Sequence, residues 1–252
     1  MLHNENLYIS GDNTRLFLNL ELGCGSSCSY CYLPAEGMRQ GERLPLQLFC
    51  TPELLLEQLS RDARFVRGRH GTILSIGCFS ECWNLAIKPQ TIRLIENLLV
   101  FDNWIQFVTK CQIMEADLQA ITSNSHWRDQ VLAYISSATI SQWQHYERDT
   151  TPPDQRFQSF AACAASGLRA CLYIKPVLPG VTLQDADLYG SIMQTHGINA
   201  VVGDLFIANS DCRDTISVIS RHLHVVEHPE VASLRSELER FGLVFENSTQ
   251  NL

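Results

Sequence analysis

The sequence lacks both a long apolar run and an excess of basic residues. Among its 252 residues no apolar stretch approaches the roughly 18 residues that a membrane-spanning helix needs, so we expect no membrane segment. Asp and Glu outnumber Lys and Arg by 27 to 19, which gives a formal net charge of −8. The densest basic group, within residues 61–70, has the helical spacing of a solvated face rather than of a phosphate-binding stripe. A nucleic-acid partner is therefore disfavoured.

A secretory signal is also missing, because the chain opens on Met-Leu-His-Asn-Glu-Asn, with neither a basic nor an apolar segment. Ten cysteines without such a signal indicate a reducing compartment, so we expect a cytoplasmic protein. No low-complexity stretch or linker interrupts the chain. We expect a single domain over residues 1–252, with a core at about 15–207 and a C-terminal extension at about 208–252.

Three of the ten cysteines lie within eight residues, at Cys24, Cys28 and Cys31. Three thiolates at this spacing can hold three irons of a [4Fe–4S] cluster and leave the fourth iron without a protein ligand. A small molecule can bind to that open iron and receive an electron from it. The spacing therefore predicts a reactive iron–sulfur centre rather than a closed structural one.

These cysteines also allow two other interpretations, a structural zinc site and a redox-active C-x-x-C motif. A structural zinc site needs four ligands, usually from two C-x2–4-C pairs or from added histidines. Here Cys78 and Cys82 form only one further C-x3-C pair. A redox-active C-x-x-C made of Cys28 and Cys31 would leave Cys24 without a role. We favour the cluster and keep a non-catalytic iron–sulfur or zinc-binding protein as the alternative.

The rest of the sequence alternates β-rich runs with amphipathic segments. Thr51 followed by Pro52 is typical of a helix start, and Gly167 and Gly197 are typical of residues that follow helix ends. Six runs are predicted to be strands: Arg15–Leu20, Thr72–Ile76, Trp104–Thr109, Val131–Ser136, Ala170–Lys175 and Asn199–Ile207. The helices are predicted at Thr51–Leu59, Lys88–Leu99, Glu115–Ile121, Asp154–Ser166, Asp185–His196 and Pro229–Phe241. Such alternation implies parallel strands with right-handed crossovers and with the chemistry at their carboxyl ends.

The cysteine loop, with Tyr30 before its last cysteine, resembles the cluster loop of the radical S-adenosylmethionine (radical SAM) enzymes. The resemblance implies an α/β fold, a partial (β/α)6 TIM-type barrel, and the apolar stretch Leu243–Phe245 would cover one mouth of it. It also implies a [4Fe–4S] cluster and S-adenosyl-L-methionine as cofactors, with Tyr30 beside them. A flavodoxin- or ferredoxin-type protein would reduce the cluster. The 5′-deoxyadenosyl radical would then abstract hydrogen from a substrate.

Further motifs look like the spore photoproduct lyase-like branch of this family. Many members of the family have Gly-Gly-Glu after the second strand, whereas this chain has Ser80 and Glu81 there. The resemblance makes Glu81 a ligand of the methionyl amine. The Thr-Lys after the third strand makes Lys110 a partner of the cofactor carboxylate. The alternatives are that Glu81 is a solvated residue of the loop and that Lys110 is a solvated lysine at the rim of the barrel.

The fourth strand ends in a Ser-Ser-x-Thr sequence that is similar to the same branch. By resemblance Ser136 or Ser137 would bind the ribose, while Glu147 and Arg156 would brace the site. Glu147 is followed by Arg148, where the branch has proline, and a purely structural Glu147–Arg156 ion pair is the alternative.

The substrate is less well defined by the sequence. Lys175 and Asp204 are candidates for substrate contact, and Cys78 or Cys82 could donate a hydrogen atom. The acidic composition and the short chain favour a small molecule or a peptide. Repair of a DNA lesion, as in the lyase branch, is the second possibility.

Overall fold

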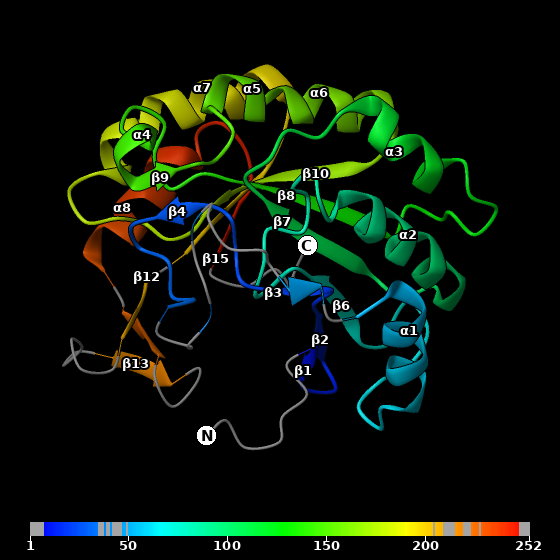
Figure 1. The fold of residues 1–252 in the computed structure, drawn as a ribbon. Coiled ribbons are helices and arrows are strands. Elements are labelled where there is room, and N and C mark those ends of the chain that lie inside the picture. Colours follow the sequence, from blue (N-terminus) through cyan, green and yellow to red (C-terminus); the bar gives the residue numbers. More distant parts are fainter. Residues whose placement is uncertain are drawn as a thin grey trace.

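The structure is a computed structural model of the chain, and it describes residues 8–34, 38, 41, 47–48, 50–203, 205–208, 215–218, 223–226 and 228–246. Its main element is an eight-stranded sheet in the order β1-β2-β6-β7-β8-β10-β11-β15 (Figure 1). These strands are β1 Ile9–Gly11, β2 Arg15–Leu18, β6 Ile73–Ile76, β7 Ile105–Thr109, β8 Val131–Ser136, β10 Arg169–Ile174, β11 Ala200–Val202 and β15 Val244–Glu246.

All neighbours in this sheet are parallel except β1, which pairs antiparallel with β2 at one edge. Among the described residues β1 and β15 do not pair, so the sheet is an open, partial barrel. Three small antiparallel sheets accompany it: β3 (Glu21–Leu22) with β5 (Gln47–Leu48), β4 (Ser27–Cys28) with β9 (Glu147–Arg148), and β14 (Leu223–Val226) between β12 (Leu205–Ala208) and β13 (Thr215–Val218).

Helices line the convex side of the curved sheet (Figure 1). They are α1 Pro52–Arg61, α2 Lys88–Leu98, α3 Glu115–Thr122, α4 Trp143–Tyr146, α5 Pro153–Arg156, α6 Gln158–Ala165, α7 Ala186–His196 and α8 Pro229–Leu238, with 3-10 turns η1 Leu99–Phe101 and η2 Thr182–Asp185. Thr51 caps α1 as predicted, accepting a hydrogen bond from the backbone N–H of Leu54 at 3.2 Å. Gly197, with φ of +61°, ends α7.

The strand side chains separate into two sets, because successive residues of a strand point to opposite faces. Leu16 and Leu18 of β2 are fully buried in a continuous core beneath the helices. The opposite face carries a second apolar cluster, which includes Tyr134 of β8 and Val201 of β11, with Tyr173 of β10 packed against it. This second face lines the inside of the partial barrel.

The six predicted strand–helix units are present, with most of their ends within three residues of the prediction. The helix predicted at Asp154–Ser166 is divided at Phe157 into α5 and α6. Two larger differences concern the sixth strand and the stretch Leu243–Phe245. The sixth strand ends at Val202, and residues 205–208 form β12 in a separate sheet. The stretch Leu243–Phe245 does not cover a mouth. Its residues 244–246 form β15, which pairs parallel with β11 and extends the sheet. The helix α8 makes this possible, since it provides the crossover that a parallel strand needs.

Candidate functional site

The three clustered cysteines lie in the loop that follows β2, beyond the carboxyl end of that strand. Cys28 is buried, whereas Cys24 and Cys31 are partly exposed. The loop is held from within by a hydrogen bond from the Cys31 N–H to the Cys28 carbonyl at 3.2 Å. From outside it is held by β9, because Cys28 of β4 lies opposite Glu147. The thiols therefore sit on a fixed segment rather than on a free loop.

The three thiols are close enough to influence one another's protonation. Burial raises the pKa of both Cys24 and Cys28 to about 11 and also raises that of Cys31. Smaller increases come from Cys31 acting on Cys24, and from Cys24 acting on Cys28. The Lys110 charge opposes the increase in the pKa of Cys28 and Cys31. A metal that binds here must displace these protons.

The donor set fits a cluster better than a single ion. Within the part of the chain that the structure describes, no group of three or more His, Cys, Asp or Glu side chains is arranged to hold one metal ion. A four-ligand zinc site needs such a group. In an iron–sulfur cluster each thiolate binds a different iron, so the sulfur atoms need not meet at one point. The nine cysteines that the structure describes form no disulfide with one another.

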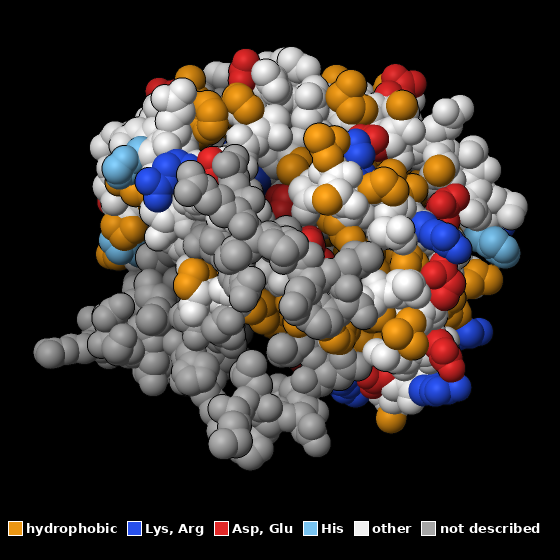
Figure 2. Space-filling view, viewed as in Figure 1, with side chains coloured by type: hydrophobic (Ala, Val, Ile, Leu, Met, Phe, Trp, Pro, Cys, Tyr) orange, Lys and Arg blue, Asp and Glu red, His pale blue; other side chains and the backbone are white. Residues whose placement is uncertain are grey.

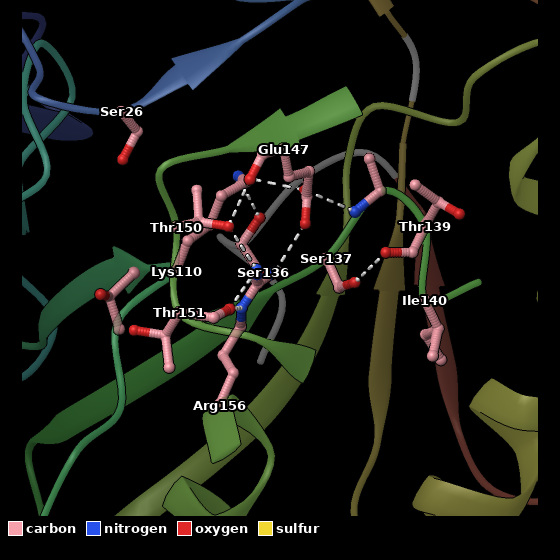
Figure 3. Close-up of polar contacts among 12 residues, drawn as sticks. Ser26, Lys110, Ser136, Ser137, Thr139, Ile140, Glu147, Thr150, Thr151 and Arg156 are labelled. Carbon is pink, nitrogen blue, oxygen red and sulfur yellow. Dashed lines mark hydrogen bonds and ion pairs between the residues drawn. The ribbon is translucent and has the colours of Figure 1, made fainter. Parts of the chain in front are cut away.

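Glu147 is the centre of a buried polar network next to this loop (Figure 3). Its Oε2 accepts a hydrogen bond from Arg156 Nη1 at 2.7 Å, and both side chains are fully buried. Its Oε1 accepts hydrogen bonds from Tyr30 Oη at 2.5 Å and from the Ala138 N–H at 2.9 Å. Lys110 Nζ lies 3.9 Å from the same oxygen. Four of the predicted site residues are thus in one network.

Two opposing effects set the protonation of Glu147. Burial raises the pKa of its carboxyl group, but the charges of Arg156 and Lys110 and the hydrogen bonds from Tyr30 and Arg156 outweigh burial. The resulting pKa lies below the ordinary value, so Glu147 is a carboxylate at neutral pH.

Arg156 and Lys110 connect this network to the carboxyl end of β8 (Figure 3). Arg156 Nη1 donates to the Ser136 carbonyl at 2.7 Å, and Nη2 donates to Thr150 Oγ1 at 2.8 Å. Lys110 Nζ donates to Ser136 Oγ at 2.8 Å and lies 5.7 Å from the centre of the Tyr30 ring. Thr150 was not predicted, and its only sequence signal is its place between Glu147 and Arg156.

Glu81 lies beside this network, and its carboxylate already has donors from the chain. It accepts hydrogen bonds from Thr109 Oγ1 at 2.5 Å, from the Lys110 N–H at 2.8 Å and from the Trp83 N–H at 3.1 Å. Its charge contributes to the raised pKa of Cys24, so it faces the cysteine loop. Its neighbour Ser80 is partly exposed.

Ser137 points away from open space. Its Oγ donates to the Thr139 carbonyl at 3.1 Å, and the residue is fully buried (Figure 3). Asp185 holds the loop that follows by accepting from Thr139 Oγ1 and from the Ile140 N–H, both at 2.7 Å. Of the two predicted serines, Ser136 is therefore the one that contacts Lys110. Asp185 serves as a fixture of the loop.

Cys78 and Cys82 have different surroundings. Cys78 is partly exposed, and Tyr32 Oη donates to its carbonyl and lies 3.6 Å from its Sγ. Cys82 is 2% exposed and belongs to the apolar core. A Cβ at Gly77, which has φ of +82°, would lie 2.9 Å from Cys82 Sγ, so the turn after β6 depends on glycine at this point.

Of the two residues predicted to contact substrate, the structure describes Lys175 but not Asp204. Lys175 directly follows β10 and is partly exposed. Asp204 lies outside the described residues.

The basic group within residues 61–70 has partners within the chain. Arg64 binds Asp62 at 2.6 Å and the Gly11 carbonyl at 2.9 Å. Arg67 lies over the Phe101 ring and Arg69 over the Trp104 ring, at 4.2 and 4.5 Å from the ring centres. Among the described residues on the face drawn in Figure 2, basic and acidic side chains are intermixed rather than gathered into a basic stripe. No helix among the described residues is long and apolar enough to cross a membrane.

Comparison with known proteins gives structural matches only. No family model and no curated protein matches the sequence. A variant of spore photoproduct lyase matches with a TM-score of 0.63 and 13% identity over 92% of this chain and 76% of that one. Another variant, with bound S-adenosylmethionine and dinucleoside spore photoproduct, gives 0.63 and 14% over 91% of this chain and 75% of that one. SuiB of Streptococcus suis, bound to S-adenosylmethionine, gives 0.64 and 10% over 94% of this chain and 51% of that one.

At these identities the similarity establishes the fold. It confirms the predicted partial barrel of the radical SAM type and, at the level of fold, the predicted likeness to spore photoproduct lyase.

Proposed function

We propose that this protein is a radical SAM enzyme that acts on a small molecule or a peptide. One observation carries the proposal: the β4–β9 pairing sets the three-thiol loop against Glu147, and Glu147 contacts Tyr30, Lys110 and Arg156. The motif that predicts a cluster and the motifs that predict a cofactor site therefore meet in one place. A metal-carrying protein without a reaction would not need that convergence.

In this proposal Cys24, Cys28 and Cys31 hold a [4Fe–4S] cluster, which a flavodoxin- or ferredoxin-type protein reduces. When bound, the cluster supplies the electron that cleaves S-adenosylmethionine to methionine and a 5′-deoxyadenosyl radical, which abstracts hydrogen from the substrate. The nine described cysteines form no disulfide with one another, which supports a reducing compartment, and we propose the cytoplasm.

The chain's own residues would bind and orient the cofactor. Lys110 would meet the methionyl carboxylate. Within the described part of the chain its ammonium group donates one hydrogen bond, to Ser136 Oγ at 2.8 Å, and lies 3.9 Å from Glu147. Ser136 would share that contact, and Ser137 would hold the ribose-facing backbone in position. Glu81, with Ser80 next to it, would receive the methionyl amine. Tyr30 and Arg156 would keep Glu147 in place beneath the site.

Cys78 is the better candidate for a hydrogen-atom donor. Its thiol is partly exposed and lies next to Tyr32, whereas Cys82 is enclosed in the apolar core. Lys175, and Asp204 outside the described residues, stay candidates for substrate contact.

Repair of a DNA lesion is the second candidate, and the similarity to a spore photoproduct lyase with a bound dinucleoside lesion favours it. The charge balance opposes it. The formal net charge is −8, and the densest basic segment has partners inside the chain.

The direct test is anaerobic reconstitution with iron and sulfide, followed by dithionite and S-adenosylmethionine. We expect about four irons per chain and formation of 5′-deoxyadenosine. The variant Cys24→Ala/Cys28→Ala/Cys31→Ala is expected to lose both. Cys163→Ala, which removes a thiol from the core beneath α6, is the matched control and is expected to keep both.

An intact cluster that forms no 5′-deoxyadenosine would favour the non-catalytic alternative. Retention of iron and activity by the triple variant would contradict the assigned ligands. Product formation from a dinucleoside spore photoproduct would favour lesion repair over a small-molecule or peptide substrate.

A further inference from the structure

Arg15 is a charged residue on the inner face of the partial barrel. It belongs to β2, where its neighbours Leu16 and Leu18 point to the helix-covered core. Arg15 therefore points the opposite way, toward the barrel interior. The residue as a whole is partly buried, but its Nε and Nη2 atoms are enclosed and have no hydrogen-bond partner among the residues that the structure describes.

The surroundings of Arg15 come from three other segments of the chain. Tyr134 of β8, Tyr173 of β10 and Cys78 after β6 all interact electrostatically with its guanidinium group. The two tyrosine rings pack edge to face, with centres 5.4 Å apart. The guanidinium is therefore close enough to Tyr134, Tyr173 and Cys78 to interact with them electrostatically.

No carboxylate among the described residues forms an ion pair with Arg15. The Asp12 carboxylate interacts electrostatically with the Arg15 guanidinium. Its Oδ1, however, already accepts hydrogen bonds from the Thr14 N–H, from Thr14 Oγ1 and from the Arg15 N–H, at 2.6 to 3.1 Å. Burial lowers the pKa of Arg15, with the tyrosines and Asp12 opposing it, yet a guanidinium stays protonated at physiological pH. A cation therefore faces the barrel interior, and no carboxylate of the described segments pairs with it there.

An enclosed N–H donor without a partner costs free energy, so native proteins rarely keep one without a use for it. A guanidinium presents paired donors that match a carboxylate or a phosphate. The Arg15 guanidinium interacts electrostatically with Cys78, the proposed hydrogen donor, which follows the carboxyl end of β6.

We propose that Arg15 binds an anionic group, a carboxylate or a phosphate, of the substrate in the barrel interior. This inference rests on the proposed function and narrows it to a small, anion-bearing substrate. The anion would be held at Arg15, beside the packed rings of Tyr134 and Tyr173, with the rest of the molecule directed toward Cys78. An ordered internal water is the competing partner for the same two N–H groups.

Four probes of similar size test the proposal: benzoate and phenyl phosphate, and their neutral analogues benzamide and benzyl alcohol. Binding to the reconstituted protein is measured by ligand-observed NMR titration in the presence of S-adenosylmethionine. We expect the protein to bind at least one anion more tightly than its neutral analogue. We expect Arg15→Met to weaken anion binding about 10- to 100-fold and to leave the neutral probes unaffected. Whether benzoate or phenyl phosphate binds more tightly distinguishes a carboxylate from a phosphate substrate.

Arg169→Met is the matched control, because Arg169 is an exposed residue of β10 whose guanidinium lies 5.4 Å from the centre of the Trp104 ring. It is expected to bind all four probes like the unmodified protein. Equal binding of charged and neutral probes, no binding of any probe, or unchanged anion binding by a folded Arg15→Met variant would each overturn the proposal.

Formation of 5′-deoxyadenosine without substrate is measured on the same samples. Arg15→Met is expected to keep it, since Arg15 does not contact Lys110 or Glu147. If Arg15→Met loses anion binding but still forms 5′-deoxyadenosine, the result therefore supports the anion-binding role of Arg15 and leaves the proposed function unaffected. Failure of the unmodified protein to form 5′-deoxyadenosine concerns the proposed function.

Discussion

Cys28 lies directly opposite Glu147 in the short antiparallel pair that β4 and β9 form. One residue belongs to the predicted cluster loop, and the other is the fully buried centre of the polar network. The two lie 119 positions apart in the sequence, 147 less 28, so the pairing closes a long loop of chain. The position of the thiols therefore depends on the stability of the Glu147 network.

Replacing Glu147 is expected to destabilise the fold. In Glu147→Gln the buried Arg156 guanidinium loses its counter-charge, and loss of one partner of a buried ion pair costs about 3–5 kcal/mol. Chemical denaturation of the apoprotein measures this as a lower free energy of unfolding. Because the pKa of Glu147 is lowered in the fold, its stabilisation is complete above its ordinary pKa and is lost as pH falls through the lower folded value. The variant is expected to lose that dependence.

The exposed pair Glu57–Arg61 provides the control for this prediction. Its atoms approach to 2.7 Å, as in the buried pair, but its side chains are 53% and 77% exposed. Glu57→Gln is therefore expected to cost less than about 1 kcal/mol. Equal effects of the two substitutions would mean that the Glu147 network does not stabilise the fold.

Lys110 is expected to determine the affinity for S-adenosylmethionine. Lys110→Met removes the ammonium group that we assign to the methionyl carboxylate, and a charge-assisted hydrogen bond contributes enough to weaken binding about tenfold or more. Titration calorimetry with reconstituted protein measures the change. Lys88→Met is the control, because Lys88 forms a similarly buried 2.7 Å ion pair with Asp117 on the outer helices. Unchanged affinity in Lys110→Met would remove Lys110 from the cofactor site.

Much of this architecture follows from local signals. The cap at Thr51 and the glycine that ends α7 are chemical features of a few adjacent residues, and both were predicted. The cysteine spacing is equally local. Glu147 and Arg156 were found only through resemblance, since no local pattern says that residues nine apart will share a buried ion pair.

Other features depend on contacts between distant segments and were missed. The strand β15 pairs with β11. In the sequence, the residues of β15 form only a short apolar run, which does not indicate a partner strand. The sequence predicts a strand at Arg15–Leu20, and the alternation of Arg15 with Leu16 and Leu18 in that strand carries a usable signal. A period of two with a charge on one face predicts two different environments. Tyr32 follows the last cysteine directly, and nothing in the sequence indicates its contact with Cys78.

Cys78 is expected to exchange hydrogen with the radical that forms in the site. When the reaction is run in D2O without substrate, its S–D bond can label the 5′-deoxyadenosine, which mass spectrometry detects. Cys78→Ala is expected to reduce that label while S-adenosylmethionine is still cleaved. Cys82→Ala, a change in the apolar core, is expected to lower the thermal stability and keep the label. The opposite result would make Cys82 the donor.

Glu21 is expected to make stability depend on pH near neutrality. Burial raises the pKa of its carboxyl group to about 6, and the hydrogen bond from Asn84 opposes this only in part. A raised pKa means that the fold favours the protonated form. The stabilisation is thus complete below the ordinary pKa near 4.5 and is lost as pH rises through about 6.

The variant Glu21→Gln tests this dependence, because its side chain stays uncharged at every pH. Relative to the unmodified protein, it is expected to be equally stable at pH 4 and more stable at pH 7, by about 1 kcal/mol after allowance for partial solvation. Denaturation curves across that pH range measure the difference. A gap that does not change with pH would show that the charge of Glu21 is not what destabilises the fold.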